Sequence, residues 1–155
     1  RVWSGKASVQ LGGNLIARLL GKLIGFPDSG ADVPVSVTVQ PDGGGERWIR
    51  DLGGVTFSSR LQHGRDRNER LVTERFGPVS VALALVRRAD RLYFIPRRWN
   101  IFGVPLPAFL MPGGESFETM VDGRFHFDVE IRVPLFGLVA AYKGWLVPEG
   151  DVDAR

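Results

Sequence analysis

Short turn signals recur through this chain, each between two strand-length runs in which apolar and polar residues alternate. Turns of this kind connect antiparallel neighbouring strands. They lie at Asp42-Gly43-Gly44-Gly45, Gly53-Gly54, Gly64–Asn68, Gly77-Pro78, Ala89-Asp90 and Asp122-Gly123. The pattern predicts a long meander of hairpins, and it constrains the fold far more than it constrains the activity.

The runs between these turns predict about ten strands. Alternation of period two begins after Pro34, where Val35, Val37 and Val39 share one face. The other predicted strands are Lys6–Leu11, Glu46–Leu52, Val55–Gln62, Glu69–Phe76, Val79–Arg88, Arg91–Pro96, Glu115–Val121, Arg124–Val133 and Leu138–Val147. Because strand twist accumulates and open edges invite aggregation, we expect a strongly curved sheet or a barrel.

One helix is predicted before the meander, so the expected fold class is α+β, mostly β. Asn14 can cap its start, and Gly25 followed by Pro27 ends it. Apolar residues recur at helical spacing at Leu15, Ile16, Leu19, Leu20 and Leu23. We expect this amphipathic helix to pack on the sheet, and a membrane-surface helix with Arg18 and Lys22 opposite the leucines is the alternative.

Length and composition favour a single domain over residues 1–155. Cysteine is absent, so disulfides, thiol nucleophiles and zinc-thiolate sites are excluded, and we expect a cytoplasmic location. No apolar stretch is long enough to span a bilayer. The chain starts at Arg1 without a methionine, and we expect it to be part of a longer protein.

Positive charge is concentrated in the middle of the chain. Residues 47–98 hold 12 Arg and 5 acidic residues, a net charge of +7, and the remainder carries 8 − 12 = −4. Arginine is a good fork for phosphate or carboxylate, but the interleaved acids favour a solvated face over a dedicated anion site. The arginines also lie on different faces of successive strands, so we predict no nucleic-acid binding.

The run Phe125–Val133 alternates cleanly and places His126, Asp128, Glu130 and Arg132 on one face. Such a face could hold a divalent metal or pair a general base with its orienting carboxylate. An exposed charge ladder explains the pattern equally well. We therefore predict no catalytic residue, metal or cofactor, and keep a small isomerase or hydrolase using His126 with Asp128 or Glu130 as the last alternative.

The segment Ile95–Pro112 is long, broken by proline and rich in large apolar side chains. Pro105, Pro107 and Pro112 block regular pairing, so these side chains must cover a core, cap a cavity mouth, or meet a partner or lipid. Arg97, Arg98 and Trp99 at its head suit an anionic amphiphile.

Five segments together resemble the DUF4166 family, a bacterial domain family of unknown function: Glu46–Arg50, Leu71–Pro78, Gly103–Pro107, Gly123–Asp128, and Pro134–Gly137 continuing through Tyr142–Leu146. The resemblance covers most of the chain. It implies an accessory role, because the family often lies C-terminal to a saccharopine-dehydrogenase-like, NAD(P)-binding oxidoreductase domain. It transfers no catalytic residue.

From these observations we expect a non-catalytic module that binds a small apolar or amphiphilic ligand beside an oxidoreductase domain. Buried Arg and Trp need partners, and an Arg facing a barrel interior marks the head-group end of a pocket. Candidate contacts, chosen by residue type, are Trp48, Arg50, Glu74, Arg75, Arg97, Trp99, Tyr142 and Trp145. The alternative is a structural or interaction domain that docks on a partner through the apolar loop 101–112.

Overall fold

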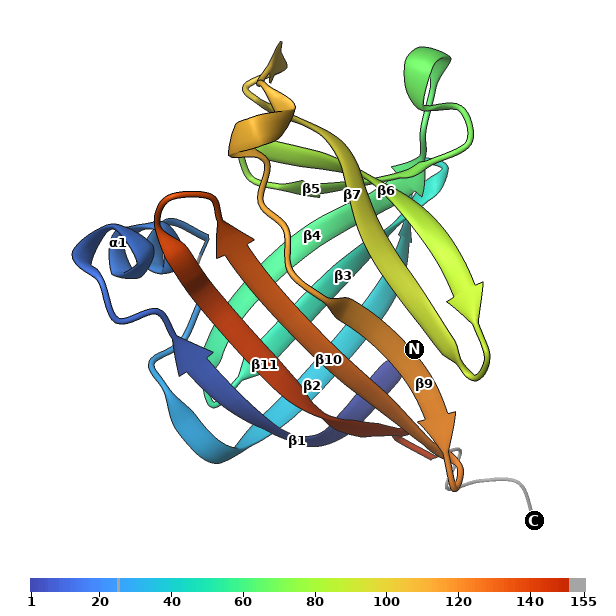
Figure 1. The fold of residues 1–155 in the computed structure, drawn as a ribbon. Coiled ribbons are helices and arrows are strands. Elements are labelled where there is room, and N and C mark those ends of the chain that lie inside the picture. Colours follow the sequence, from blue (N-terminus) through green and yellow to red (C-terminus); the bar gives the residue numbers. More distant parts are fainter. Residues whose placement is uncertain (25, 151–155) are drawn as a thin grey trace.

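The computed structural model describes residues 1–24 and 26–150, and most of them lie in antiparallel strands (Figure 1). The helical elements are α1 (Leu15–Ile24) and the short 3-10 turns η1 (Asp66–Asn68) and η2 (Ala108–Leu110). The strands are β1 (Val2–Leu11), β2 (Gly30–Asp42), β3 (Gly45–Leu52), β4 (Val55–His63), β5 (Val72–Phe76), β6 (Val79–Arg88), β7 (Arg91–Ile101), β8 (Val104–Pro105), β9 (Ser116–Val121), β10 (Arg124–Val133) and β11 (Gly137–Pro148).

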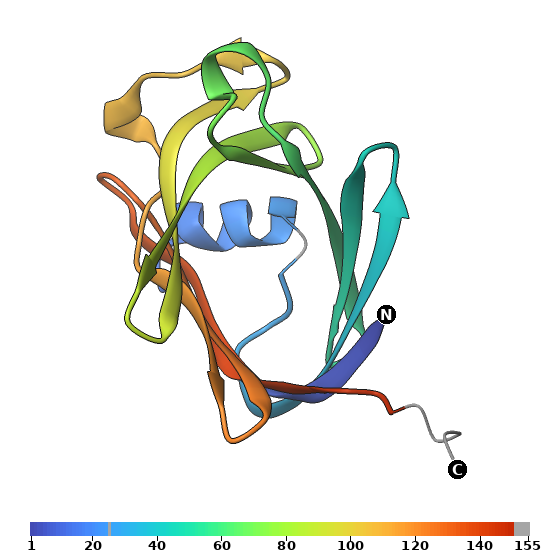
Figure 2. The same cartoon turned by 90° about the vertical axis from the view of Figure 1, so that its right-hand side faces the viewer.

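Within the described residues, ten of these strands close into an antiparallel barrel. The hydrogen-bonded order is β6-β5-β4-β3-β2-β1-β11-β10-β9-β7, and pairing of β6 with β7 completes the ring. The view down the barrel shows the ring and, at its far end, α1 (Figure 2). The expectation of a mostly β, antiparallel meander that curls into a barrel is therefore confirmed. Strand β8 only adds a short hairpin to β7.

Several observed strands have other bounds than those predicted. β1 begins at Val2 instead of Lys6, and β2 begins at Gly30 instead of Pro34. β5 begins at Val72 instead of Glu69, because the preceding residues form η1 and a turn. β7 continues past Pro96 to Ile101, so the head of the proline-broken segment is a strand. The register shifts at this point, with Ala82 opposite Arg98 but Leu83 opposite Pro96. A bulge of this kind accommodates a proline, which has no N–H to donate to the ladder.

The register determines which side chains face the lumen, because residues directly opposite each other on neighbouring strands share a face. The inward positions are the odd-numbered residues of β1, β4, β6 and β10, the odd-numbered residues of β2 from Val33, and the even-numbered residues of β3, β5, β9 and β11. The buried core lies on the side formed by β1–β4, β10 and β11, and its members include Val9, Val35, Leu52, Phe127 and Leu146.

The helix prediction is only partly correct. Asn14 caps α1, since its Oδ1 accepts a hydrogen bond from the Ala17 N–H at 2.6 Å. The described part of the apolar face, however, is exposed and does not pack on the sheet. Leu15 is 82% exposed, and Ile16 and Leu19 are also exposed. The side chains of Leu20 and Leu23, and all of Gly25, lie outside the described residues.

Small residues mediate the contact of α1 with the barrel. Ala17 and Gly21 are buried, and the helix lies against β11 and β1 at one barrel end. Close approach to strand ends favours small side chains, and Leu15 and Leu19 are left exposed. No helix in the described part of the chain is both long and apolar enough to cross a membrane.

Phe26 closes the barrel end beneath α1. Its ring lies 5.1 Å from the ring of Phe57 on β4 and 5.4 Å from the ring of Tyr142 on β11. These two strands belong to different walls of the barrel, and Phe26 itself is buried. The side chain therefore plugs this end from the inside.

The backbones of β1 and β11 approach closely at Gly144. A Cβ atom at this position would lie 2.1 Å from the Lys6 carbonyl oxygen and 2.9 Å from the Ala7 Cβ. We expect Gly144→Ala to lower the free energy of unfolding by about 1–3 kcal/mol, because the strands must move apart. Gly13→Ala is the control, since its Cβ would meet nothing within 4 Å. Urea denaturation followed by tryptophan fluorescence measures both variants, and equal stabilities would contradict the tight β1–β11 contact.

Candidate ligand-binding site

A polar cluster lies inside the barrel on β3, β4 and β5. Arg50 donates from Nη1 to the Ser59 Oγ at 2.7 Å and from Nη2 to the Glu74 Oε1 at 3.2 Å. Ser59 donates to the same Glu74 oxygen at 2.6 Å. The side chains of Arg50 and Glu74 are 14% and 13% exposed. Removing two charged side chains from water costs free energy, which their mutual attraction often does not repay. The Arg50–Glu74 pair is therefore unlike the apolar side chains that usually fill a barrel.

The guanidinium of Arg50 also contacts aromatic faces. Its Cζ lies 5.3 Å from the ring centroid of Trp48 and 5.7 Å from that of Phe57. Such contacts suit a guanidinium in a low-dielectric setting. Phe57 in turn touches the Phe26 plug, so Arg50 lies next to the closed end of the lumen.

A second carboxyl group, that of Glu118, faces this cluster from β9. Four strands separate β3 from β9 in either direction around the ring, so Arg50 and Glu118 lie on opposite walls. Burial raises the pKa of Glu118 to about 7; the positive charge of Arg50 opposes this shift and the negative charge of Glu74 adds to it. The charges of the two walls therefore act on each other across the lumen.

Tyr142 on β11 completes the cluster. It faces inward opposite Val9 and Val129, and its ring lies 5.8 Å from that of Phe127. Burial raises its pKa to about 12; the positive charge of Arg50 opposes this shift, and the negative charges of Glu74 and Glu118 add to it. The hydroxyl thus stays protonated at neutral pH. Hydrogen bonding to protein groups is not among the causes of either shift, for Tyr142 or for Glu118.

The barrel brings five of the eight predicted contact residues to its inner face: Trp48, Arg50, Glu74, Trp99 and Tyr142. The indole of Trp48 donates to Glu46 at 3.0 Å. The indole of Trp99 donates to the Pro107 carbonyl at 3.0 Å, so the apolar loop folds back towards this residue.

The other three predicted contacts lie on the outside. Arg75 donates to the Gly77 carbonyl at 3.0 Å, and Trp145 lies under the guanidinium of Arg124 at 4.7 Å. Arg97 occupies the bulge of β7 and is exposed. These three residues therefore do not join the cluster in the lumen.

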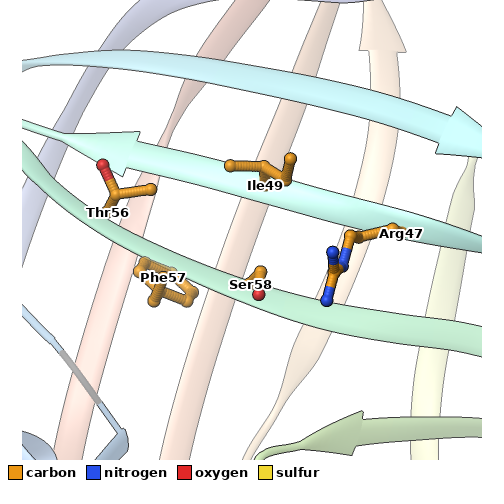
Figure 3. Close-up of a pocket in the computed structure, with 5 residues that line it drawn as sticks. All are labelled: Arg47, Ile49, Thr56, Phe57 and Ser58. Carbon is orange, nitrogen blue, oxygen red and sulfur yellow. The ribbon is translucent and has the colours of Figure 1, made fainter.

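Two shallow hollows lie on the outer surface. The first, of about 230 Å³, is lined by Arg47, Ile49, Thr56, Phe57 and Ser58 on β3 and β4 (Figure 3). The second, of about 520 Å³, is lined by Asp66, Arg67, Glu69, Arg70, Leu71, Arg97 and Arg98. The second hollow mixes arginines with two acids, and Arg98 is already bonded to the Asn68 side chain at 2.9 Å.

The polar residues of β10 lie on the outer face of the barrel. His126 stands opposite Thr119 and Trp145, and Asp128 stands opposite Lys143. Glu130 is paired with Arg132. Across the described ranges 1–24 and 26–150, no group of three or more His, Asp or Glu side chains is placed to hold a metal ion. The face is an ordinary charged strand surface.

Glu118 and Ser59 are the cluster members that residue type alone did not identify. A glutamate on a strand is usually exposed. Glu118 alternates with Phe117 and Thr119, so the sequence shows that it points to the opposite face from these two neighbours. That this face is the inner one follows only from its pairing with Leu92 and Phe127.

These features define a class: a closed, ten-stranded antiparallel barrel with a capped end and a polar cluster in its lumen, within the described residues. The family model described as "Domain of unknown function (DUF4166)" matches residues 1–146, and the chain belongs to this family. Comparison with curated proteins finds no significant match.

The pKa of Glu118 predicts a pH-dependent stability. The pKa of Glu118 rises from 4.5 in the unfolded chain to about 7 in the folded protein, so folding favours the protonated carboxyl. This contribution to the free energy of unfolding is fully present below about pH 4.5 and is lost as the pH rises through about 7. We therefore expect Glu118→Gln to gain stability relative to the wild type, by about 1–3 kcal/mol between about pH 5 and about pH 8.

Urea denaturation at the two pH values measures this difference. Glu115→Gln is the control, because Glu115 is exposed just before β9 and is expected to show no comparable change. A constant difference between Glu118→Gln and the wild type at both pH values would show that Glu118 is solvated.

Proposed function

We propose that this domain is a non-catalytic carrier or binding module that takes a small apolar or amphiphilic ligand into the barrel. The observation that supports the proposal most strongly is the polar cluster of Arg50, Ser59, Glu74, Glu118 and Tyr142, which converges on the lumen from different walls. Concave apolar sites with a few convergent polar groups are typical of small-molecule binding.

Incomplete filling of the lumen supports the same proposal. Several inward-facing residues on β5, β6, β7 and β9 are only half-buried, among them Val72, Val81, Phe94 and Glu118, although Leu83 on β6 is buried. Ten strands also enclose a wider interior than the eight that side chains alone fill.

An apolar rim marks the route into the lumen. Leu85 and Met120 belong to the inward-facing series of β6 and β9, yet they are 43% and 57% exposed. Both lie near hairpins at the barrel end opposite α1, which is the near end in Figure 2. An apolar chain entering here would meet the rim first and the Arg50 cluster last.

A pair of neighbouring residues on β6 provides the test. Val81 faces the lumen opposite Glu74 and Trp99, whereas Ser80 faces outward opposite Arg75 and Asn100. We expect Val81→Trp to weaken binding of the uncharged fluorescent dye Nile red by about tenfold or more, because the indole occupies the lumen. Ser80→Trp is expected to bind as the wild type does.

Circular dichroism confirms that both variants keep the β-structure before binding is compared. Equal dye affinities in the two variants, or no dye binding to the wild type, would reject a lumenal site. Native mass spectrometry of freshly purified protein, with an organic extract of the same sample, identifies any ligand carried from the cell.

A second candidate function is docking on a partner domain through the apolar loop 101–112. Phe102 is 82% exposed and Phe109 is 73% exposed, so these two side chains of the loop do not cover the core. Exposed large apolar side chains of this kind mark interaction surfaces. The proposed partner is a neighbouring NAD(P)-binding oxidoreductase domain in a bacterial cytoplasm, with this domain as its accessory module.

Light scattering tests the docking candidate. We expect the isolated domain to self-associate through the loop, and Phe109→Ser to restore a monomer because it removes the most exposed apolar group of η2. Leu135→Ser is the control, since Leu135 is also exposed but lies in the β10–β11 turn. A wild type that remains a monomer at high concentration would contradict this candidate.

A further inference from the structure

Resting on the proposed lumenal function, we propose that the polar cluster selects an amphiphile with an uncharged, hydrogen-bonding head group, such as an alcohol, over one with a carboxylate head group. The sequence-based expectation was the opposite, since an arginine inside a barrel suggests an acidic head group. The arrangement of charges around Arg50 is the reason for the change.

The positive charge of Arg50 already has a partner. Its Nη2 lies 3.2 Å from Glu74, and Ser59 holds that same carboxylate oxygen at 2.6 Å. The Ser59 hydroxyl also accepts from Arg50 at 2.7 Å, so the three side chains form one closed network. A ligand carboxylate would have to share Arg50 with Glu74 at close range, and two carboxylates in one site repel each other.

The remaining charge in the lumen is negative. Away from the rims, the inward positions of the described strands carry Arg50 as a cation and Glu74 and Glu118 as acids. The total is therefore zero when Glu118 is protonated and −1 when it is ionised. Adding a carboxylate makes the sum −1 or −2 in a poorly solvated space, which disfavours binding.

Two groups that face the lumen, the Tyr142 hydroxyl and the Glu118 carboxyl, are not among the side-chain hydrogen bonds formed within residues 1–24 and 26–150, so a neutral head group can supply a partner. The Tyr142 hydroxyl stays protonated, so it donates or accepts. The Glu118 carboxyl donates when protonated and accepts when ionised. A ligand hydroxyl both donates and accepts, so it can satisfy Glu118 in either state. Buried polar groups gain most when such a partner is provided.

The test compares three probes with the same alkyl chain: decanol, decanoic acid and decylamine. The affinity of the wild-type domain for each probe is measured by competition with Nile red, at about pH 6 and about pH 8. We expect decanol to bind about tenfold or more tightly than decanoic acid, with little change between the two pH values. Decanoic acid is expected to weaken further at the higher pH, because Glu118 ionises.

Glu118→Gln separates the causes. The variant is expected to lose the pH dependence of decanoic acid binding and to bind decanoic acid more tightly than the wild type at the higher pH. Tighter binding of decanoic acid or of decylamine than of decanol by the wild type would overturn the inference while leaving the lumenal site intact. Failure of all three probes to displace the dye would reject the proposed function as well.

Discussion

Closure of the barrel between β1 and β11 is the constraint on which the interior depends. The ladder from Trp3–Pro148 to Leu11–Ala140 joins the first and last strands, so no strand of the ring keeps a free edge there. Because side chains alternate along each strand, closure encloses every second residue of the ring. A slip of one residue in β3 would exchange Arg50 for Ile49 inside. The pairing register therefore determines which polar side chains face the lumen.

One side of the barrel interior is closely packed and apolar, and the other side is polar and partly exposed to solvent. Around β1, β2 and β11 it is filled with valine, leucine and alanine, and Phe26 is packed among aromatic rings. Around β5, β6, β7 and β9 the inward residues keep contact with solvent and include two carboxyl groups. A fully apolar lumen would be more stable, since buried charges are costly even when paired. Local departures from the best packing are typical of functional sites.

The local sequence pattern predicted most of the strands, because alternation and glycine turns are short-range signals, and it left a strongly curved sheet and a closed barrel as alternatives. It failed for α1, where the spacing of Leu15 and Leu19 indicated a buried stripe but the close contact with β11 and β1 selects Ala17 and Gly21 instead. It also failed for Glu118, whose direction is determined by pairing with Leu92, distant in sequence. Arg75 and Trp145 were predicted as contacts from their residue type alone. Their odd positions on β5 and β11 place them on the outer face of the barrel.

Phe26 closes the barrel at the end beneath α1, where its ring contacts Phe57 and Tyr142. In the proposed function, a ligand would enter and leave past Leu85 and Met120, which are exposed at the other end of the barrel. For the proposed ligand, the rate of exchange would then depend on the hairpins that follow β6 and β9, and its selectivity would depend on the charged groups of the lumen.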